Sequence, residues 1–216
     1  MILIPVKNQQ NAKQRLAEVL TQEQRQALAE AMLADVLQAV AGLSARPEVA
    51  LVTSDPFAVG LAHALDFRVI ADEDNRGETA AIEMATHVAV EHGAEWTLVI
   101  PADAPLVTAG ELESILYAAP EAGAVLAPDH RGRGSNAVLR RPAALFPLRF
   151  GDDSFAPHVQ AASATGRSVV LLQLPGIALD VDRPDELAML ANAPGETRSQ
   201  LLARAWGVAQ AAAPVS

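Results

Sequence analysis

Short apolar runs alternate with longer helical stretches through the first half of the chain, and this alternation constrains the fold more than any other feature. The apolar runs cover residues 1–6, 49–53, 67–70 and 96–100. Segments with helical spacing of apolar residues lie between them, at 21–42, 55–65 and 78–92. Strands and helices that alternate at this spacing are typical of βαβ units. We therefore predict an α/β fold with a mostly parallel central sheet and helices on both faces.

Capping residues support three of the expected helices. Thr21 and Thr108 are followed three positions later by Gln24 and Glu111, which is the sequence signature of a capping box. Asp55 stands directly before a proline, the usual order at a helix start. The helices at 21–42, 55–65 and about 109–117 are thus predicted from local signals as well as from periodicity.

The rhythm changes in the second half of the chain. We expect two strands joined by a glycine-rich loop, a helix, another strand and two final helices, at 123–128, 135–139, 154–165, 169–174, 184–190 and about 195–206. No repeat, heptad run or linker is visible in the sequence. The simplest organisation is one domain over residues 1–206, followed by a frayed tail at 207–216.

Charge and composition exclude several classes of protein. The formal net charge of −10 leaves no basic face for nucleic acid. The chain holds no cysteine, which rules out disulfides and thiolate metal sites and suits a cytoplasmic enzyme. Its apolar runs are shorter than the ~18 residues of a membrane helix, and the N-terminal run is too short for a signal peptide. We expect a cytoplasmic protein without membrane or nucleic-acid partners. The oligomeric state stays open, with a homodimer among the alternatives.

Asp103 ends one of the apolar runs and lies between two prolines. Pro101 and Pro105 fix the backbone on both sides, so the carboxylate has little freedom. In open α/β sheets ligands bind beyond the carboxyl ends of the strands, where this acid is expected. Asp103 is either a turn residue before the next helix or a ligand to a bound group.

Asp180 and Asp182 follow a second short apolar run, 177–179, which we interpret as another strand-like segment. Alternate residues of an extended segment point the same way, so both carboxylates can face one point. Together with Asp103 they offer three hard oxygen ligands suited to Mg²⁺ bound with nucleotide phosphates. Asp182 also fits a helix N-cap, whereas Asp180 has no such alternative.

Basic residues cluster after the first predicted strand. Lys7, Lys13 and Arg15 place fixed positive charge where a triphosphate would need it. Neither the P-loop pattern nor the dinucleotide-binding glycine pattern occurs there. From spacing alone, a solvated basic loop is the better explanation.

Two glycine-rich loops, at 131–136 and 150–155, complete the set of candidate segments. Their glycines allow backbone N–H groups to approach an anion, and Ser135 and Ser154 add hydroxyl groups. The first loop also fits a simple hairpin turn. The five histidines show no metal-ligand spacing, and those at 63, 87 and 92 are expected on helix surfaces.

Taken together and in order, these segments resemble the CofC/FbiD family, the guanylyltransferases of coenzyme F-420 biosynthesis. The motifs that carry the resemblance are Pro5-Val-Lys7 with Ala12-Lys-x-Arg-Leu16, Pro101-Ala-Asp-x-Pro-Leu106, Gly132-x-Gly-Ser-Asn136, Phe150-Gly-x-x-Ser-Phe155 and Leu179-Asp-Val-Asp-x-Pro184. The resemblance covers about residues 1 to 190. It implies a Rossmann-like nucleotidyltransferase fold of the GT-A type.

The resemblance also implies a reaction. GTP and a small phosphorylated C3 acid would give a guanosine diphospho-linked product and pyrophosphate, with Mg²⁺ as cofactor and a downstream transferase as recipient of the product. The acid in the family is phosphoenolpyruvate, 2-phospho-L-lactate or 3-phosphoglycerate, and the sequence does not choose among them. A sugar-phosphate nucleotidyltransferase and a non-catalytic GTP-binding protein stay open as alternatives.

Residue roles follow from the same resemblance. The metal would be held by Asp103, Asp180 and Asp182, and the triphosphate by Lys7, Lys13 and Arg15. The acceptor carboxylate would be held by Ser135, Gly151 and Ser154, and the nucleotide also by Gly77 and Thr79. The family often has Gly-Leu-Asn where this chain has Gly77-Glu78-Thr79, and a threonine where it has Ser135. The first departure adds a charge beside the nucleotide, so base preference is less secure than the fold.

Overall fold

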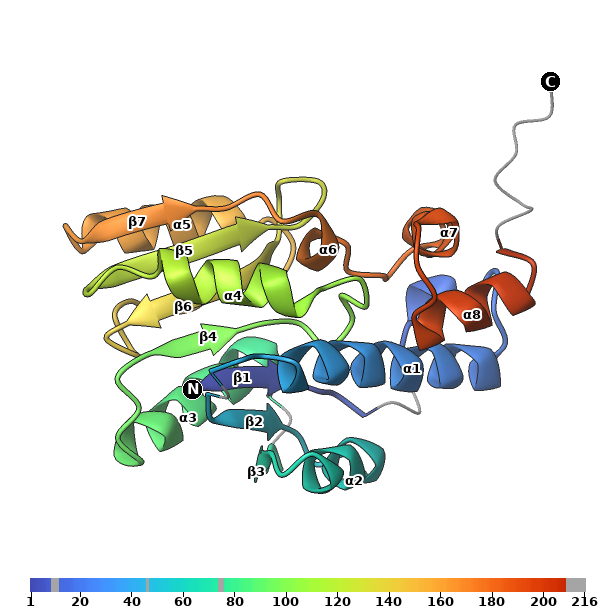
Figure 1. Ribbon diagram of the computed structural model, residues 1–216, viewed down its shortest axis with the longest axis horizontal. Coiled ribbons are helices and arrows are strands. Elements are labelled where there is room, and N and C mark those ends of the chain that lie inside the picture. The colour runs from blue at the N-terminus through green and yellow to red at the C-terminus, as the bar shows by residue number, and fades with distance from the viewer. Residues whose placement is uncertain (9–11, 46, 74–75, 209–216) are drawn as a thin grey trace.

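A single seven-stranded sheet organises the computed structural model, which describes residues 1–8, 12–45, 47–73 and 76–208. The strands are β1 (Ile2–Pro5), β2 (Val49–Val52), β3 (Arg68–Ile70), β4 (Thr97–Val99), β5 (Gly123–Pro128), β6 (Ser135–Arg141) and β7 (Ser168–Leu171). The helices are η2 (Gln14–Leu16), α1 (Gln22–Ala41), α2 (Pro56–Ala64), α3 (Glu78–Glu91), α4 (Ala109–Ala118), α5 (Phe155–Ala164), α6 (Pro175–Ala178), α7 (Pro184–Asn192) and α8 (Arg198–Ala205). Figure 1 shows helices covering the sheet.

The strand order is β3-β2-β1-β4-β6-β5-β7. Six strands run parallel, while β6 pairs antiparallel with both β4 and β5. The chain winds outward from β1 in both directions, so β1 and β4 flank the point where the winding reverses. A mostly parallel sheet is the predicted architecture, and it is confirmed.

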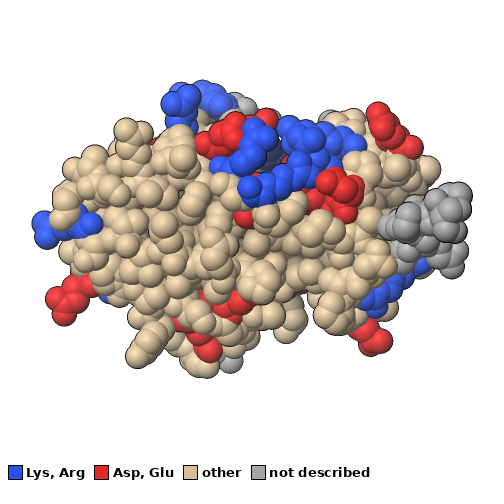
Figure 2. Space-filling view, turned by 90° about the horizontal axis from the view of Figure 1, so that it is seen from above, with Lys and Arg blue, Asp and Glu red and all other residues tan. Residues whose placement is uncertain are grey.

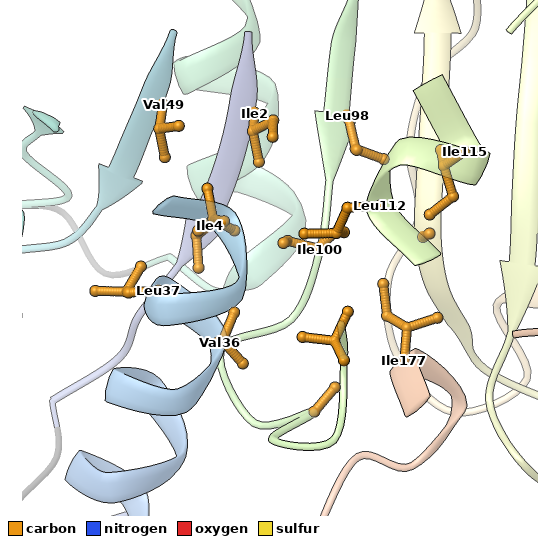
Figure 3. Packing of buried hydrophobic residues seen from close by; sticks show 14 of the residues in the cluster. Ile2, Ile4, Val36, Leu37, Val49, Leu98, Ile100, Leu112, Ile115 and Ile177 are labelled. Carbon is orange, nitrogen blue, oxygen red and sulfur yellow. The ribbon is translucent and has the colours of Figure 1, made fainter. Parts of the chain in front are cut away.

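Alternate residues along the central strand β1, and Met1 just before it, are buried on opposite faces of the sheet. Ile2 and Ile4 pack with α1, α2 and α4, in the layer drawn in Figure 3. Met1 and Leu3 pack on the other face with α3 and α5. Because both faces are covered, the strand is apolar at every position, as expected for a parallel sheet. Helices on both faces are therefore confirmed.

A third apolar cluster lies beyond the sheet edge. The first half of α1 extends past the sheet and packs with α8, and α8 packs with α7 (Figure 1). The cluster contains Leu16 from η2, Val181 from the segment before α7, and Leu187 from α7 itself. The cluster therefore joins the segment around Lys13 to the segment around Asp182.

Local capping signals are confirmed. At the start of α1, the backbone N–H groups of Thr21 and Gln24 each donate to the other residue's side-chain oxygen. Thr108 and Glu111 form the same reciprocal pair at α4. The Asp55 carboxylate accepts from two backbone N–H groups of α2. These interactions are local, which is why sequence alone predicts them.

Two predictions in the second half are wrong. Residues 177–179 are not strand-like, because 175–178 form the short helix α6, and Asp180 and Asp182 follow that helix. The strand expected at 169–174, by contrast, is confirmed as β7, which ends earlier, at Ser168–Leu171. The N-cap of α7 is Arg183 and not Asp182. Of the tail predicted at 207–216, residues 209–216 lie outside the described residues. No helix in the described part of the chain is long and apolar enough to span a membrane.

Candidate active site

A cavity of about 520 Å³ opens at the carboxyl edge of the sheet, where the winding reverses. Its wall includes Lys7 after β1 and Asp103 after β4. Since β6 runs antiparallel, its amino end reaches the same edge and adds Ser135 and Asn136. On the face seen in Figure 2, basic and acidic side chains gather around a hollow. This is the position at which open α/β sheets bind ligands.

Lys13 lies at the centre of the charged groups. Its Nζ donates to Oδ2 of Asp103 and, at 2.8 Å, to Oδ1 of Asp182. The Lys13 side chain is only 8% exposed. Burial opposes its charge, but the carboxylates of Asp103 and Asp182 outweigh burial and raise the pKa of the ammonium. Lys13 therefore stays protonated and links two loops that are far apart in sequence.

Backbone contacts hold those two loops together. The N–H of Val181 donates to the carbonyl of Asp103 at 3.0 Å, while the Val181 side chain is buried. Leu16, also buried, anchors the segment after Lys13 in the same apolar cluster. Lys13 adopts a left-handed backbone conformation, with φ 56°, immediately before η2. The position of the charged groups is thus fixed by packing behind them.

Asp180 is held by a side chain from the antiparallel strand. The amide of Asn136 donates to Oδ1 of Asp180 at 2.9 Å and to the carbonyl oxygens of Ile177 and Ala178. This amide therefore links the end of α6 to the amino end of β6. Asn136 was not predicted as a site residue, although it stands in the quoted Gly-Ser-Asn motif.

Negative charge exceeds positive charge around Asp180 and Glu78. Burial, with the charges of Asp103 and Asp182, raises the pKa of Asp180 to about 6. Burial and the charge of Asp103 likewise raise the pKa of Glu78 to about 7, with Lys7 opposing the shift. Burial opposes ionisation of Asp182 as well, but Lys13 and other nearby cations lower its pKa. The cavity therefore favours an added cation.

The residues fit a magnesium ion that is completed by substrate. Carboxylate oxygens are the ligands Mg²⁺ prefers, and the ion commonly uses one or two of them together with phosphate oxygens and water. Within the described ranges, no three His, Cys, Asp or Glu side chains are arranged to hold a metal by themselves. The three-aspartate site at Asp103, Asp180 and Asp182 stays a prediction for the substrate-bound state.

The other predicted basic residues lie on the rim of the cavity. Arg15 is about half exposed, with guanidinium nitrogens 3.7 Å from Asp182 and 3.9 Å from Asp152. Lys7 is exposed and lines the same cavity. The structure thus brings Lys7, Lys13 and Arg15 to one opening.

Ser135, Gly151 and Ser154 meet on another part of the wall. The backbone N–H of Ser135 donates to Oγ of Ser154 at 3.0 Å, which joins the two glycine-rich loops. Both serines are buried except for their cavity side. Gly151 has φ 132°, a backbone conformation that glycine adopts much more readily than other residues. The first of these loops, at 131–136, also forms the predicted hairpin between β5 and β6.

Gly77 and Thr79 do not line the cavity, although Glu78 between them does. Gly77 caps α3 with φ 103°. The hydroxyl of Thr79 accepts a hydrogen bond from the N–H of Phe150 at 2.9 Å. Their assignment to nucleotide binding stays a prediction, and the visible role of Thr79 is to hold the loop at residue 150.

Sequence reasoning missed several residues that shape the site. Glu186 accepts from the backbone N–H groups of Asp182 and Arg183, and Arg131 contacts its other oxygen at 2.9 Å. His158 is buried behind Ser135, whereas the three histidines expected on helix surfaces are indeed exposed. Glu186 follows Arg183 by three residues, a spacing that could have indicated a cap. His158 carried no such signal.

The comparison with family models agrees with this geometry. The model described as "Guanylyl transferase CofC like" matches residues 1–208. The chain belongs to the CofC guanylyl transferase family. The resemblance read from the motifs is thereby confirmed, and a nucleotidyltransferase enzyme is the class that family and fold share.

Relatives within the CofC family cover most of the chain. A phosphoenolpyruvate guanylyltransferase from Rubrobacter xylanophilus is 37% identical, over 87% of this chain and 91% of its own length. A 2-phospho-L-lactate guanylyltransferase from Methanothermobacter thermautotrophicus is 32% identical, over 86% of this chain and 81% of its own. These two names differ in the acceptor acid.

Solved structures show the same fold at lower sequence identity. A protein from Desulfovibrio desulfuricans G20, proposed to be a nucleotide-diphospho-sugar transferase, has a TM-score of 0.80 at 19% identity and covers 97% of this chain and 96% of its own. A nucleotidyl transferase from Methanothermobacter has a TM-score of 0.56 at 20% identity, covering 88% and 95%. The predicted nucleotidyltransferase fold is confirmed.

Proposed function

We propose that this CofC family member joins GTP to phosphoenolpyruvate, giving enolpyruvyl-diphospho-guanosine and pyrophosphate. The Lys13 ammonium between Asp103 and Asp182, at the edge where the sheet reverses its winding, is the observation that carries the proposal. The phosphoenolpyruvate guanylyltransferase from Rubrobacter xylanophilus, and relatives of the same name from other bacteria, support this acceptor. The product would pass to a downstream transferase of coenzyme F-420 biosynthesis, in the cytoplasm.

The reaction needs positioning and charge neutralisation more than proton transfer. An oxygen of the acceptor phosphate, already ionised near neutral pH, attacks the α-phosphorus of GTP in line. A new P–O bond forms as the bond to the pyrophosphate oxygen breaks, and no general base is required. Catalysis of this kind rests on orientation and electrostatic stabilisation.

The charged residues supply that stabilisation. Lys7, Lys13 and Arg15 would bind the triphosphate and stabilise the pyrophosphate as it leaves. Asp103, Asp180 and Asp182 would hold Mg²⁺, which neutralises phosphate charge when bound. Ser135, Ser154 and the backbone of Gly151 would hold the acceptor carboxylate, and Gly77 and Thr79 would support the nucleotide side.

Product analysis tests the proposal directly. The protein is incubated with GTP, Mg²⁺ and, in parallel, phosphoenolpyruvate, 2-phospho-L-lactate or 3-phosphoglycerate, and products are identified by mass spectrometry after coupling to the downstream transferase. We expect enolpyruvyl-diphospho-guanosine as the main product. A different acid in that role would correct the acceptor and leave the reaction class intact.

The Asp103→Asn variant tests the metal assignment. It should lose magnesium-dependent pyrophosphate release, because the residue contacts Lys13 and stands at the predicted metal position. Unchanged release in this variant would refute the metal assignment. GTP binding by the wild type without release would instead indicate a non-catalytic binding protein, and turnover only with sugar phosphates would indicate a sugar-phosphate enzyme.

A further inference from the structure

His158 lies on α5, four residues after Ser154, directly behind the cavity wall. It is 1% exposed. Its ring meets the ring of Phe150 edge-on, at 5.2 Å between centroids and 68° between planes, and the ring of Phe146 lies 6.4 Å away. The imidazole is therefore buried against two aromatic rings, and hydrogen bonds at both of its nitrogens set its orientation.

Hydrogen bonds define which imidazole nitrogen carries the proton. The backbone N–H of Arg149 donates to Nε2 of His158 at 2.8 Å. A backbone amide is only a donor, so Nε2 accepts and carries no hydrogen. Burial and the charge of Arg140 lower the pKa of His158 to about 4, which leaves the ring neutral near pH 7. The single ring hydrogen is therefore on Nδ1.

This tautomer determines the direction of the neighbouring hydroxyl. Nδ1 of His158 lies 2.8 Å from Oγ of Ser135, so Nδ1–H donates and Oγ accepts. The hydrogen of the Ser135 hydroxyl must then point elsewhere, and the structure gives it no acceptor within the described parts of the chain. Oγ of Ser154 is likewise used as an acceptor, by the N–H of Ser135. Both hydroxyl hydrogens remain for a ligand in the cavity.

We propose that His158 is a positioning residue that holds the Ser135 hydroxyl as a hydrogen-bond donor toward the anionic acceptor. This inference rests on the proposed function, which places the acceptor carboxylate at Ser135, Gly151 and Ser154. A carboxylate can only accept hydrogen bonds, so a hydroxyl that rotates freely would offer it a donor only part of the time. Fixing the donor in advance lowers the cost of binding the acceptor.

Two substitutions at His158 separate its two hydrogen bonds. Gln can place an amide oxygen near Nε2 and keep the bond from Arg149, but it has no donor at the Nδ1 position. Asn can place an amide N–H near Nδ1 and keep the bond to Ser135, but it does not reach Arg149. We expect His158→Gln to raise KM for phosphoenolpyruvate about tenfold with KM for GTP unchanged, and His158→Asn to stay within about twofold of the wild type. Equal effects of both variants, or equal increases in both KM values, would refute the proposal.

Controls distinguish positioning from simple loss of packing. His63→Gln, on the exposed surface of α2, should leave both KM values unchanged. In a Ser135→Ala background, His158→Gln should add less than about twofold, because it acts through the hydroxyl that is already absent. A full, multiplicative effect in that background would show that His158 acts by another route.

The tautomer of His158 can also be measured in the wild-type protein, so this test does not depend on the folding of a variant. Nitrogen-15 NMR of labelled histidine should show His158 as the neutral Nδ1–H tautomer, without titration between about pH 5.5 and 8. The Nε2–H tautomer, or a charged ring at neutral pH, would refute the proposal. This measurement does not depend on turnover. The wrong tautomer in a protein with guanylyltransferase activity would refute the role of His158 alone, and the expected tautomer in a protein without that activity would refute the proposed function alone.

Discussion

At the scale of single residues, the site depends on one lysine placed between two acids. Removing Lys13 would leave Asp103 and Asp182 as partly buried carboxylates without their cation, a costly arrangement. Arg15, 52% exposed and at longer distance, cannot take over that role. The same ammonium is the charge we assign to the departing pyrophosphate, so structure and chemistry both depend on it.

Lys13→Met should therefore reduce kcat/KM for pyrophosphate release by on the order of 10²- to 10³-fold, the usual effect of losing one electrostatic stabiliser of a transition state. The measurement is steady-state pyrophosphate release with GTP and phosphoenolpyruvate. Arg68→Met, at a half-exposed position on β3, is the control and should change the rate by less than about twofold. A loss below about threefold in Lys13→Met would contradict the assigned role.

At the scale of elements, Glu186 connects α7 to the acidic loop. One carboxylate oxygen accepts from two backbone N–H groups, of Asp182 and Arg183, and the other is 2.9 Å from Arg131. Glu186 itself is only 4% exposed. The side chain of a helix residue thus fixes the position of a predicted metal ligand.

Glu186→Ala should lower the free energy of unfolding by about 1–3 kcal/mol, because two part-buried N–H groups lose their acceptor. It should also lower kcat/KM about tenfold through misplacement of Asp182, and Glu186→Gln should recover part of both, since its amide oxygen still accepts. Thermal unfolding and steady-state kinetics give the two values. Asp185→Ala, on the same turn but 65% exposed, serves as the control. Equal losses in Asp185→Ala and Glu186→Ala would argue against a specific role for the buried carboxylate.

At the scale of the whole molecule, a layer of helices beyond the sheet edge supports the charged residues of the site from behind. The cluster that contains Leu16, Val181 and Leu187 joins η2, α1, α7 and α8. This layer brings the N-terminal and C-terminal parts of the chain together behind Lys13 and Asp182. Its packing should therefore control both stability and the geometry of the charges.

Leu187→Ala should destabilise the protein by about 2–5 kcal/mol, because it leaves a cavity at a fully buried position. Leu201→Ala, on α8 and 52% exposed, makes the same chemical change at the surface and should cost well under about 1 kcal/mol. Denaturant unfolding of the two variants measures the difference. Similar losses would mean that the outer layer is not a packed core in solution.

Burial of Glu78, together with repulsion by nearby carboxylates, should also appear in the pH dependence of stability. The pKa of Glu78 is raised from 4.5 to about 7 by burial and by Asp103, so the folded state holds this proton more tightly than the unfolded chain. Stability from Glu78 is therefore present below pH 4.5 and is lost as pH rises toward 7.

Glu78→Gln removes that titration. The melting temperature of the variant relative to the wild type should increase between pH 4.5 and 7 and then level off, by about 3–6 °C in the ligand-free protein. Glu91→Gln, exposed on the same helix, is the control and should show no such trend. A difference that shrinks with rising pH would contradict the direction of the shift.

The success of sequence reasoning depended on the range of the interactions involved. Thr21 with Gln24, Thr108 with Glu111, and Asp55 with its proline act within one helical turn, so they predicted helix starts correctly. Residues 177–179 failed because a short apolar run fits a strand or a buried helical turn equally well. In the folded protein this segment forms the helix α6, in which Ile177 packs into the core beside the sheet.

The sequence by itself determined the alternation of strands and helices, the capped helix starts, and the motifs that mark the CofC family. Those features depend on periodicity and on neighbours along the chain. Only the tertiary structure decided that Lys13 pairs with Asp103 and Asp182, that Asn136 holds Asp180, and that His158 orients Ser135. Each of these contacts joins segments brought together by the sheet order and by the antiparallel direction of β6, which no local pattern in the sequence encodes.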